Sequence, residues 1–317
     1  MHVLAFLLSA PFIEVAALFL SIVWMMRNQK DKVRPLLVIA LTVNLFYGIL
    51  LSIFMGAEGG LLPWKYDPFL FALDSALGVP WLTVARSLQG MWRVPLATIY
   101  QLMVPMMVCW FLIVRKSGRG GALVLAYVAE LVTGPLLYAV VPACGPAYAL
   151  GSDWLHGVPP VPGMMRLAGM PNAFPSLHIA TALVLLLFAP GKWSRAVASA
   201  FFAATVLATI STGEHYVIDL VPGLAFGCYA AEAGRRRLRW ALSYLAITVF
   251  WCVLVRFESA WLLSHRLVLK AMVAGTLAAI GVEFGKQWLF WDSMAVAGAD
   301  EFDAAPEQLP PVHMARP

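Results

Sequence analysis

The sequence predicts an all-α, polytopic transmembrane helix bundle of about eight or nine spans. Three observations lead to this fold class. Hydrophobic residues make up 61% of the 317 residues and charged residues only 12%, against roughly 25% charged in soluble domains. Apolar stretches of about 20 residues, the length that crosses a bilayer, recur along the chain. Basic residues gather in alternate loops between these stretches, as the positive-inside rule predicts.

We expect nine apolar segments, of which the fifth is too short for a full span and suits a helix that begins inside a cavity. The segments are 3–26, 35–55, 94–114, 121–142, 177–190, 196–212, 216–233, 240–256 and 267–291. The first segment is too long for a cleavable signal peptide and lacks its basic start. After the last segment, an acidic tail with several prolines (295–317) is expected to be disordered.

The placement of charge predicts the orientation. The loops after the first, third, fifth and seventh segments hold 13 of the 22 lysine and arginine residues, and the alternate loops hold six. The rich loops are therefore expected in the cytoplasm, with the N-terminus outside and the C-terminus inside. These residues form short clusters beside the membrane, so they indicate topology in a multi-pass protein of the plasma (inner) membrane and exclude nucleic acid as the partner.

The longest loops, about 56–93 and 143–176, both fall on the predicted outer side. The pattern from Asp67 to Asp74 predicts an interfacial helix capped by Asp67, with Pro68 in its first turn. Within the spans, Glu130 is expected to be an interhelical hydrogen-bond partner. The four cysteines show neither a disulfide framework nor metal-ligand spacing, so we expect no metal and no cofactor.

Two short motifs carry the chemistry: Phe174–His178 (FPSLH) and Gly213–Asp219 (GEHYVID). Each places a histidine at the mouth of an apolar helix, where an ionisable side chain is costly and usually functional. Asp219 follows His215 by four residues, which puts it on the same helix face, where it can hold the imidazole in one tautomer. The predicted topology brings both histidines to the outer membrane face. The pair predicts acid–base and nucleophilic chemistry on a polar group attached to a lipid.

The two motifs resemble the second and third signature motifs of the type 2 phosphatidic acid phosphatase superfamily. More narrowly, residues 172–178 and 209–223 are similar to the inositol phosphorylceramide synthase branch, and Pro142–Tyr148 resembles a stretch upstream in that branch. The resemblance implies a phosphatase-like catalytic core. We therefore divide the chain into N-terminal spans with an outer interfacial segment (1–93), this core (94–233), C-terminal spans (234–294) and the tail (295–317).

The resemblance also implies roles for the motif residues. His215 would be the nucleophile that becomes transiently phosphorylated, Asp219 would orient it, and His178 would be the general acid and then the base. The implied protein is a lipid phosphotransferase that moves a phosphoryl headgroup from a membrane lipid donor to an alcohol acceptor. Two alternatives stay open: a lipid phosphate or pyrophosphate phosphatase, and a non-catalytic transporter or scaffold with the same fold.

The chain departs from the superfamily pattern in its basic residues. The superfamily's first motif carries a lysine and an arginine, and its third carries an arginine six residues before the histidine. This chain has no basic residue in Pro142–Tyr148 and has Thr209 at that last position, where the synthase-like branch also has a non-basic residue. The substrate is therefore expected to contact Arg166, which lies in the same loop as FPSLH, together with Lys65, Tyr148, and Ser176 with the free amides of its helix start. Arg86 and Arg93 are the other cations on the predicted outer side.

Overall fold

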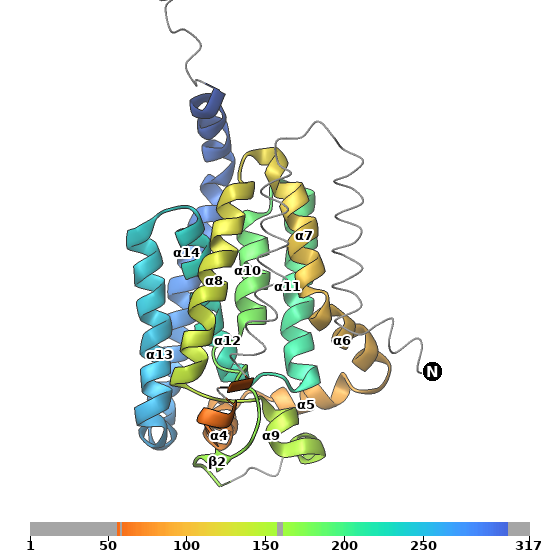
Figure 1. The fold of residues 1–317 in the computed structure, drawn as a ribbon, viewed down its shortest axis with the longest axis vertical. Coiled ribbons are helices and arrows are strands. Elements are labelled where there is room, and N and C mark those ends of the chain that lie inside the picture. Colours follow the sequence, from red (N-terminus) through yellow and green to blue (C-terminus); the bar gives the residue numbers. More distant parts are fainter. Residues whose placement is uncertain (1–55, 58, 157–160, 304–317) are drawn as a thin grey trace, which may run out of the picture. The chain divides into compact units, whose positions relative to one another are not determined.

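The computed structural model describes residues 56–57, 59–156 and 161–303. In this part, residues up to Thr276 belong to one compact unit and those from Leu277 onward to a second. Helices dominate (Figure 1), and among the described residues the only sheet is an antiparallel pair, β1 (Trp64–Lys65) with β2 (Met165–Arg166). The α-helices are α4 (Asp67–Leu77), α5 (Trp81–Ser87), α6 (Arg93–Gln101), α7 (Met103–Val114), α8 (Gly120–Val140), α9 (Pro146–Leu150), α10 (Leu177–Phe188), α11 (Lys192–Thr212), α12 (Val217–Gly234), α13 (Leu238–Ser264) and α14 (Arg266–Asp303). Short 3-10 helices occupy Gly90–Trp92, Arg115–Ser117 and Gly151–His156.

Four helices in the described ranges are long and apolar enough to cross a membrane: α8, α11, α12 and α13. The pair α4–α5, bent by 100°, and the pair around α6–α7, bent by 55°, raise the number to six if each pair is one span. The protein is therefore an integral membrane protein. α10, with 12 residues, matches the expected short fifth segment.

The predicted count of eight or nine spans is not confirmed. Segments 3–26 and 35–55 lie outside the described residues, and the ninth falls in α14, which is not among the four spanning helices. The single helix expected over 94–114 is two helices that meet at Leu102. Pro105 explains the break, because proline lacks the N–H that would continue the earlier helix and clashes with the carbonyl four residues before it. α14 also includes residues 295–303, the start of the expected tail.

Helix α12 packs against α8, α10 and α13. A Cβ atom at Gly223 would lie 2.7 Å from the Ser176 carbonyl oxygen, and one at Gly227 would lie 2.8 Å from the Ala180 carbonyl oxygen. Small residues four apart let α12 approach α10 closely, a common arrangement between membrane helices. The next residue of α10, Thr181, donates a hydrogen bond to Glu130 of α8, which confirms the interhelical role predicted for this glutamate.

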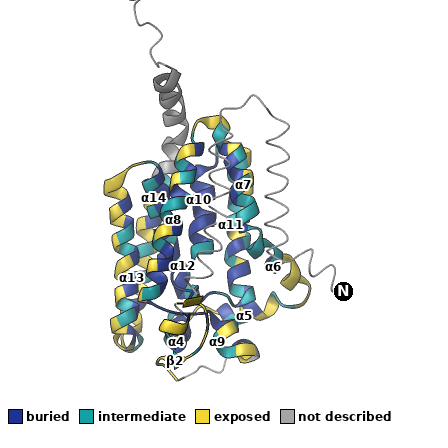
Figure 2. Cartoon of the chain, viewed as in Figure 1, coloured by how far each residue is buried: buried dark blue, intermediate teal, exposed yellow. Residues whose placement is uncertain are grey.

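Burial follows this packing (Figure 2). From Ile179 to its last residue, α10 is buried all round, as expected for an apolar helix enclosed by others. By contrast, α13 keeps many large apolar side chains exposed, among them Leu242, Phe250 and Phe257. An exposed apolar face is the surface that a bilayer covers.

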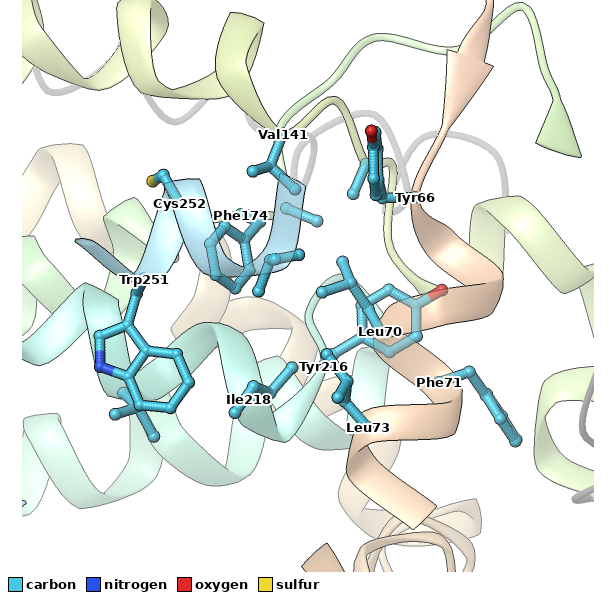
Figure 3. Packing of buried hydrophobic residues seen from close by; sticks show 14 of the residues in the cluster. Tyr66, Leu70, Phe71, Leu73, Val141, Phe174, Tyr216, Ile218, Trp251 and Cys252 are labelled. Carbon is cyan, nitrogen blue, oxygen red and sulfur yellow. The ribbon is translucent and has the colours of Figure 1, made fainter. Parts of the chain in front are cut away.

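Helix α4 lies against the start of α12 (Figure 1). Leu70 and Leu73 belong to the same buried cluster as Tyr216 and Ile218, and Figure 3 shows these side chains side by side. The prediction that Asp67 caps α4 is wrong: Tyr66 occupies the cap position, and no side chain caps the helix. The Asp67 carboxylate is fully buried and binds another segment instead.

Candidate active site

Local capping places both histidines. α10 begins after Ser176, whose Oγ accepts a hydrogen bond from the Ile179 N–H at 3.4 Å. α11 ends at Gly213, which has a φ of 72°, and α12 begins after Tyr216. We call the segment between them the 213–216 turn. Because α11 runs back along α10, His178 in the first turn of α10 and His215 in the 213–216 turn meet at the same end.

The imidazole of His215 is buried, with 1% of its surface exposed. Its Nδ1 lies 2.8 Å from the Ala173 carbonyl oxygen. A carbonyl only accepts, so Nδ1 carries the hydrogen and Nε2 carries the lone pair. Nε2 is buried and has no hydrogen-bond partner among the described residues. Burial lowers the pKa of His215 to about 4, although the Ala173 hydrogen bond and the Glu214 charge both raise it, so at neutral pH the ring is uncharged.

Asp219 is buried beside His215. Its Oδ2 accepts the Tyr216 N–H at 2.8 Å and lies 3.6 Å from His215 Nδ1, which is too long for a hydrogen bond. At this distance a carboxylate still stabilises an imidazolium through its charge. The predicted role of Asp219 in orienting His215 therefore stays a prediction. The Ala173 carbonyl orients the ring, and no sequence pattern could indicate this contact because every residue has a carbonyl.

A third ring completes the cluster. The His178 and His215 ring centroids are 5.8 Å apart, at an interplanar angle of 63°. Tyr100 of α6 stacks on His178 with its centroid 3.7 Å away and lies 6.4 Å from the His215 ring. The sequence analysis missed Tyr100. A tyrosine inside an apolar segment was a signal, but the rotation of its helix was unknown.

The residues predicted to contact the substrate lie in different settings. Ser176 is fully buried as the cap of α10, and Lys65 is fully buried with Nζ donating to the Leu62 carbonyl at 2.6 Å. Arg166 is exposed on β2 opposite Trp64. Tyr148 is 59% exposed, and its hydroxyl donates to the Ala168 carbonyl at 3.4 Å. None of these contacts involves a histidine, so the substrate roles stay predictions.

A cavity of about 580 Å³ lies beside the 213–216 turn. Its polar and aromatic lining includes Gln89, Arg93, Trp154, His156, Ser211 and Glu214. Arg93 follows the face of α6 that also carries Ala97 and Tyr100, at spacings of four and seven residues. Tyr100, which stacks on His178, lies about 10 Å further along the helix axis than Arg93. A contact between Arg93 and a phosphate at the histidine pair is therefore a prediction. Within the described ranges, no group of three His, Cys, Asp or Glu side chains could hold a metal ion.

Two histidines at adjoining helix starts, with a buried aspartate one turn on, define a membrane protein with a candidate phosphoryl-transfer site. A family model described as the PAP2 superfamily matches residues 68–233, just over half of the chain. The chain belongs to this superfamily. Its members are typically lipid phosphatases and phosphotransferases. No curated protein and no solved structure matches the chain.

Proposed function

We propose that this protein is a lipid phosphotransferase that moves a phosphoryl headgroup from a membrane lipid to an alcohol through a phosphohistidine at His215, as an inositol phosphorylceramide synthase-like protein would. One observation carries the proposal: the buried, unpartnered Nε2 of a neutral His215. A neutral imidazole whose Nε2 lone pair accepts no hydrogen bond from the described residues can attack phosphorus.

The reaction needs two steps at phosphorus. In the first, the Nε2 lone pair of His215 attacks, an N–P bond forms, the P–O bond to the leaving group breaks, and His178, as the imidazolium, gives one of its two ring protons to the departing alkoxide. Burial lowers the pKa of His178 to about 3, so this step requires the negative charge of the bound phosphate to raise that pKa again. In the second, His178 takes a proton from the acceptor alcohol, the alcohol oxygen attacks phosphorus, and the N–P bond breaks. The 5.8 Å between the two ring centroids suits both histidines to one phosphoryl group. Asp219 stabilises the charge that His215 gains.

The proposed site faces the extracytoplasmic side of the plasma (inner) membrane. This orientation rests on the 13 basic residues of the predicted cytoplasmic loops, nine of which lie in the described part of the chain at the other ends of the helices. The substrate is a membrane lipid, whose headgroup would enter where α10 and α12 begin.

Replacing His215 with alanine tests the nucleophile. Wild-type protein incubated with a phospholipid labelled in its headgroup phosphate should acquire acid-labile label and pass it to an alcohol, whereas His215→Ala should do neither. His178→Ala lacks the proposed acid, so it should become labelled only with donors whose leaving group departs without a proton. It also lacks the base for the second step, so that label should accumulate on the enzyme. Label on the His215→Ala protein, or turnover by it, would sink the assignment. Vanadate, which mimics five-coordinate phosphorus, should inhibit the wild type.

The second candidate is hydrolysis, in which water replaces the alcohol and inorganic phosphate leaves. Both reactions use the same residues, so the label's destination decides between them. Absence of any product across a broad lipid panel, with a correctly folded wild type, would favour the non-catalytic transporter or scaffold.

A further inference from the structure

Two buried carboxylates on α4 lie outside both histidine motifs. Asp67 and Asp74 are seven residues apart, which puts them on one face of α4, about two helical turns from each other. Both side chains are 0% exposed. A carboxylate is almost never fully buried without partners, so their partners show what they do.

Asp74 binds the start of α12. Its Oδ2 accepts the Val217 N–H and its Oδ1 accepts the Ile218 N–H, each at 2.7 Å. These are the first two amides of α12, which have no partner inside their own helix. The preceding amide, that of Tyr216, donates to Asp219. Three consecutive backbone amides directly after His215 are therefore held by carboxylates, and two of them by a carboxylate from a different helix.

Asp67 binds two segments that meet at the site. Its Oδ1 accepts a hydrogen bond from the hydroxyl of Tyr216, the residue after His215, at 3.0 Å. The same carboxylate accepts the Cys144 and Gly145 amides, at 3.1 and 2.9 Å. The preceding carbonyl, that of Ala143, accepts the amides of Asn172 and Ala173.

These contacts form a closed series of hydrogen bonds that includes the His215 imidazole. Ala173 donates its N–H to the Ala143 carbonyl, and its own carbonyl accepts a hydrogen bond from His215 Nδ1. The loop at Cys144 and Gly145 also docks directly on the turn, because the Ala147 N–H donates to the Gly213 carbonyl at 2.8 Å. Asp67 thus ties the segment that carries the imidazole to the segment that fixes its tautomer.

We propose that Asp67 and Asp74 are positioning residues for His215: Asp74 fixes the backbone that carries it, and Asp67 fixes the carbonyl that sets its tautomer. This inference rests on the proposed role of His215 as nucleophile. Neither aspartate touches the substrate. A nucleophile must be held within a fraction of an ångström of its line of attack, so a carboxylate that holds the backbone on both sides of it acts on the rate.

The test uses the full chain purified in detergent and compares Asp67→Asn, Asp74→Asn, Asp74→Ala and the control Ser75→Ala. Ser75 lies on the same helix, is exposed, and bonds only within the helix. We expect kcat to fall about tenfold or more in Asp74→Ala and Asp67→Asn, with the donor KM nearly unchanged. Asp74→Asn, which keeps one accepting oxygen, should lie between Asp74→Ala and the wild type. Ser75→Ala should match the wild type.

A second readout does not depend on activity. Nitrogen NMR of protein labelled at its histidine rings, with the His215 signal assigned by its loss in His215→Gln, reports which ring nitrogen carries the hydrogen. The wild type should show hydrogen on Nδ1, and Asp67→Asn should show a mixture of tautomers. Losses of kcat that only follow the fraction of unfolded protein, or a tautomer that does not change, would overturn the inference. If the wild type lacks turnover but Asp67→Asn shifts the tautomer, the proposed function fails and the positioning role stands.

Discussion

Gly145→Ala should show whether the close contact between Gly145 and the 213–216 turn affects the catalytic rate, apart from the effect of backbone strain on stability. Gly145 precedes α9 with φ 89° and ψ 153°, a region open essentially to glycine alone. A Cβ atom there would lie 2.2 Å from the Glu214 carbonyl oxygen and 2.7 Å from the carbonyl carbon. Both are backbone atoms of the 213–216 turn, so no side chain can move aside to make room.

The magnitude follows from that distance. Restoring an ordinary contact of 3.4 Å moves the turn that carries His215 by about 1 Å, and a misplacement of this size costs about 100-fold in rate. The strained backbone itself costs ~1–3 kcal/mol of stability.

Gly191 supplies the matched control. It precedes α11 with φ 81° and ψ 167°, the same backbone region, but a Cβ atom there meets nothing within 4 Å. Gly191→Ala should lose a similar amount of stability and keep its rate. The assay measures kcat for release or transfer of labelled phosphate, alongside the thermal unfolding midpoint of each variant. If Gly145→Ala keeps a rate within about threefold of Gly191→Ala, the close docking does not limit catalysis and the reasoning is wrong.

Three further results are expected. Lowering the pH from 6.5 to 4 should remove the stability that neutral His215 contributes, because the unfolded chain protonates this histidine in that window while the folded protein, in which its pKa is about 4, does not. The free energy of unfolding of the wild type should therefore fall by about 3 kcal/mol relative to that of His215→Gln, and a constant difference between the two proteins would contradict this. Arg93→Ala should raise the donor KM about tenfold and more than Arg166→Ala does, because Arg93 lines the cavity beside the site and Arg166 lies exposed on β2; equal effects would contradict this. Tyr100→Phe should keep kcat and Tyr100→Leu should lower it, because the ring stacked on His178 carries the effect and the hydroxyl does not; a loss in Tyr100→Phe would assign the hydroxyl a role.

The sequence predicted the parts of the site that leave a local pattern. The FPSLH and GEHYVID motifs, the short helix after Ser176 and the opposite course of α11 follow from composition and spacing, and they suffice to bring His178 near His215. The family match over residues 68–233 confirms the superfamily, while the synthase-like branch stays a prediction.

The supporting contacts could not be predicted in the same way. Asp74 binds two backbone amides more than 140 residues away, and backbone amides have no sequence signature. The Asp67–Pro68 pattern is typical of a helix start, which concealed the interior role of the carboxylate. The position of the Tyr100 side chain depends on the bend at Leu102, and Pro105 explains this bend only after the ends of the two helices are known. Local periodicity gives helices, but it does not give their rotation or their long-range partners.

The hydrogen bond between Asp67 and Tyr216 also fixes an order of events during synthesis. The two residues are 149 positions apart, so a ribosome adding about 5–20 residues per second needs about 7–30 s to supply the partner of a carboxylate already made. His178 emerges in that interval, yet the amides that Asp74 holds do not yet exist. A chain that ends between residues 178 and 215 carries one histidine without the other, so under the proposed function it would be inactive until α12 has joined α4.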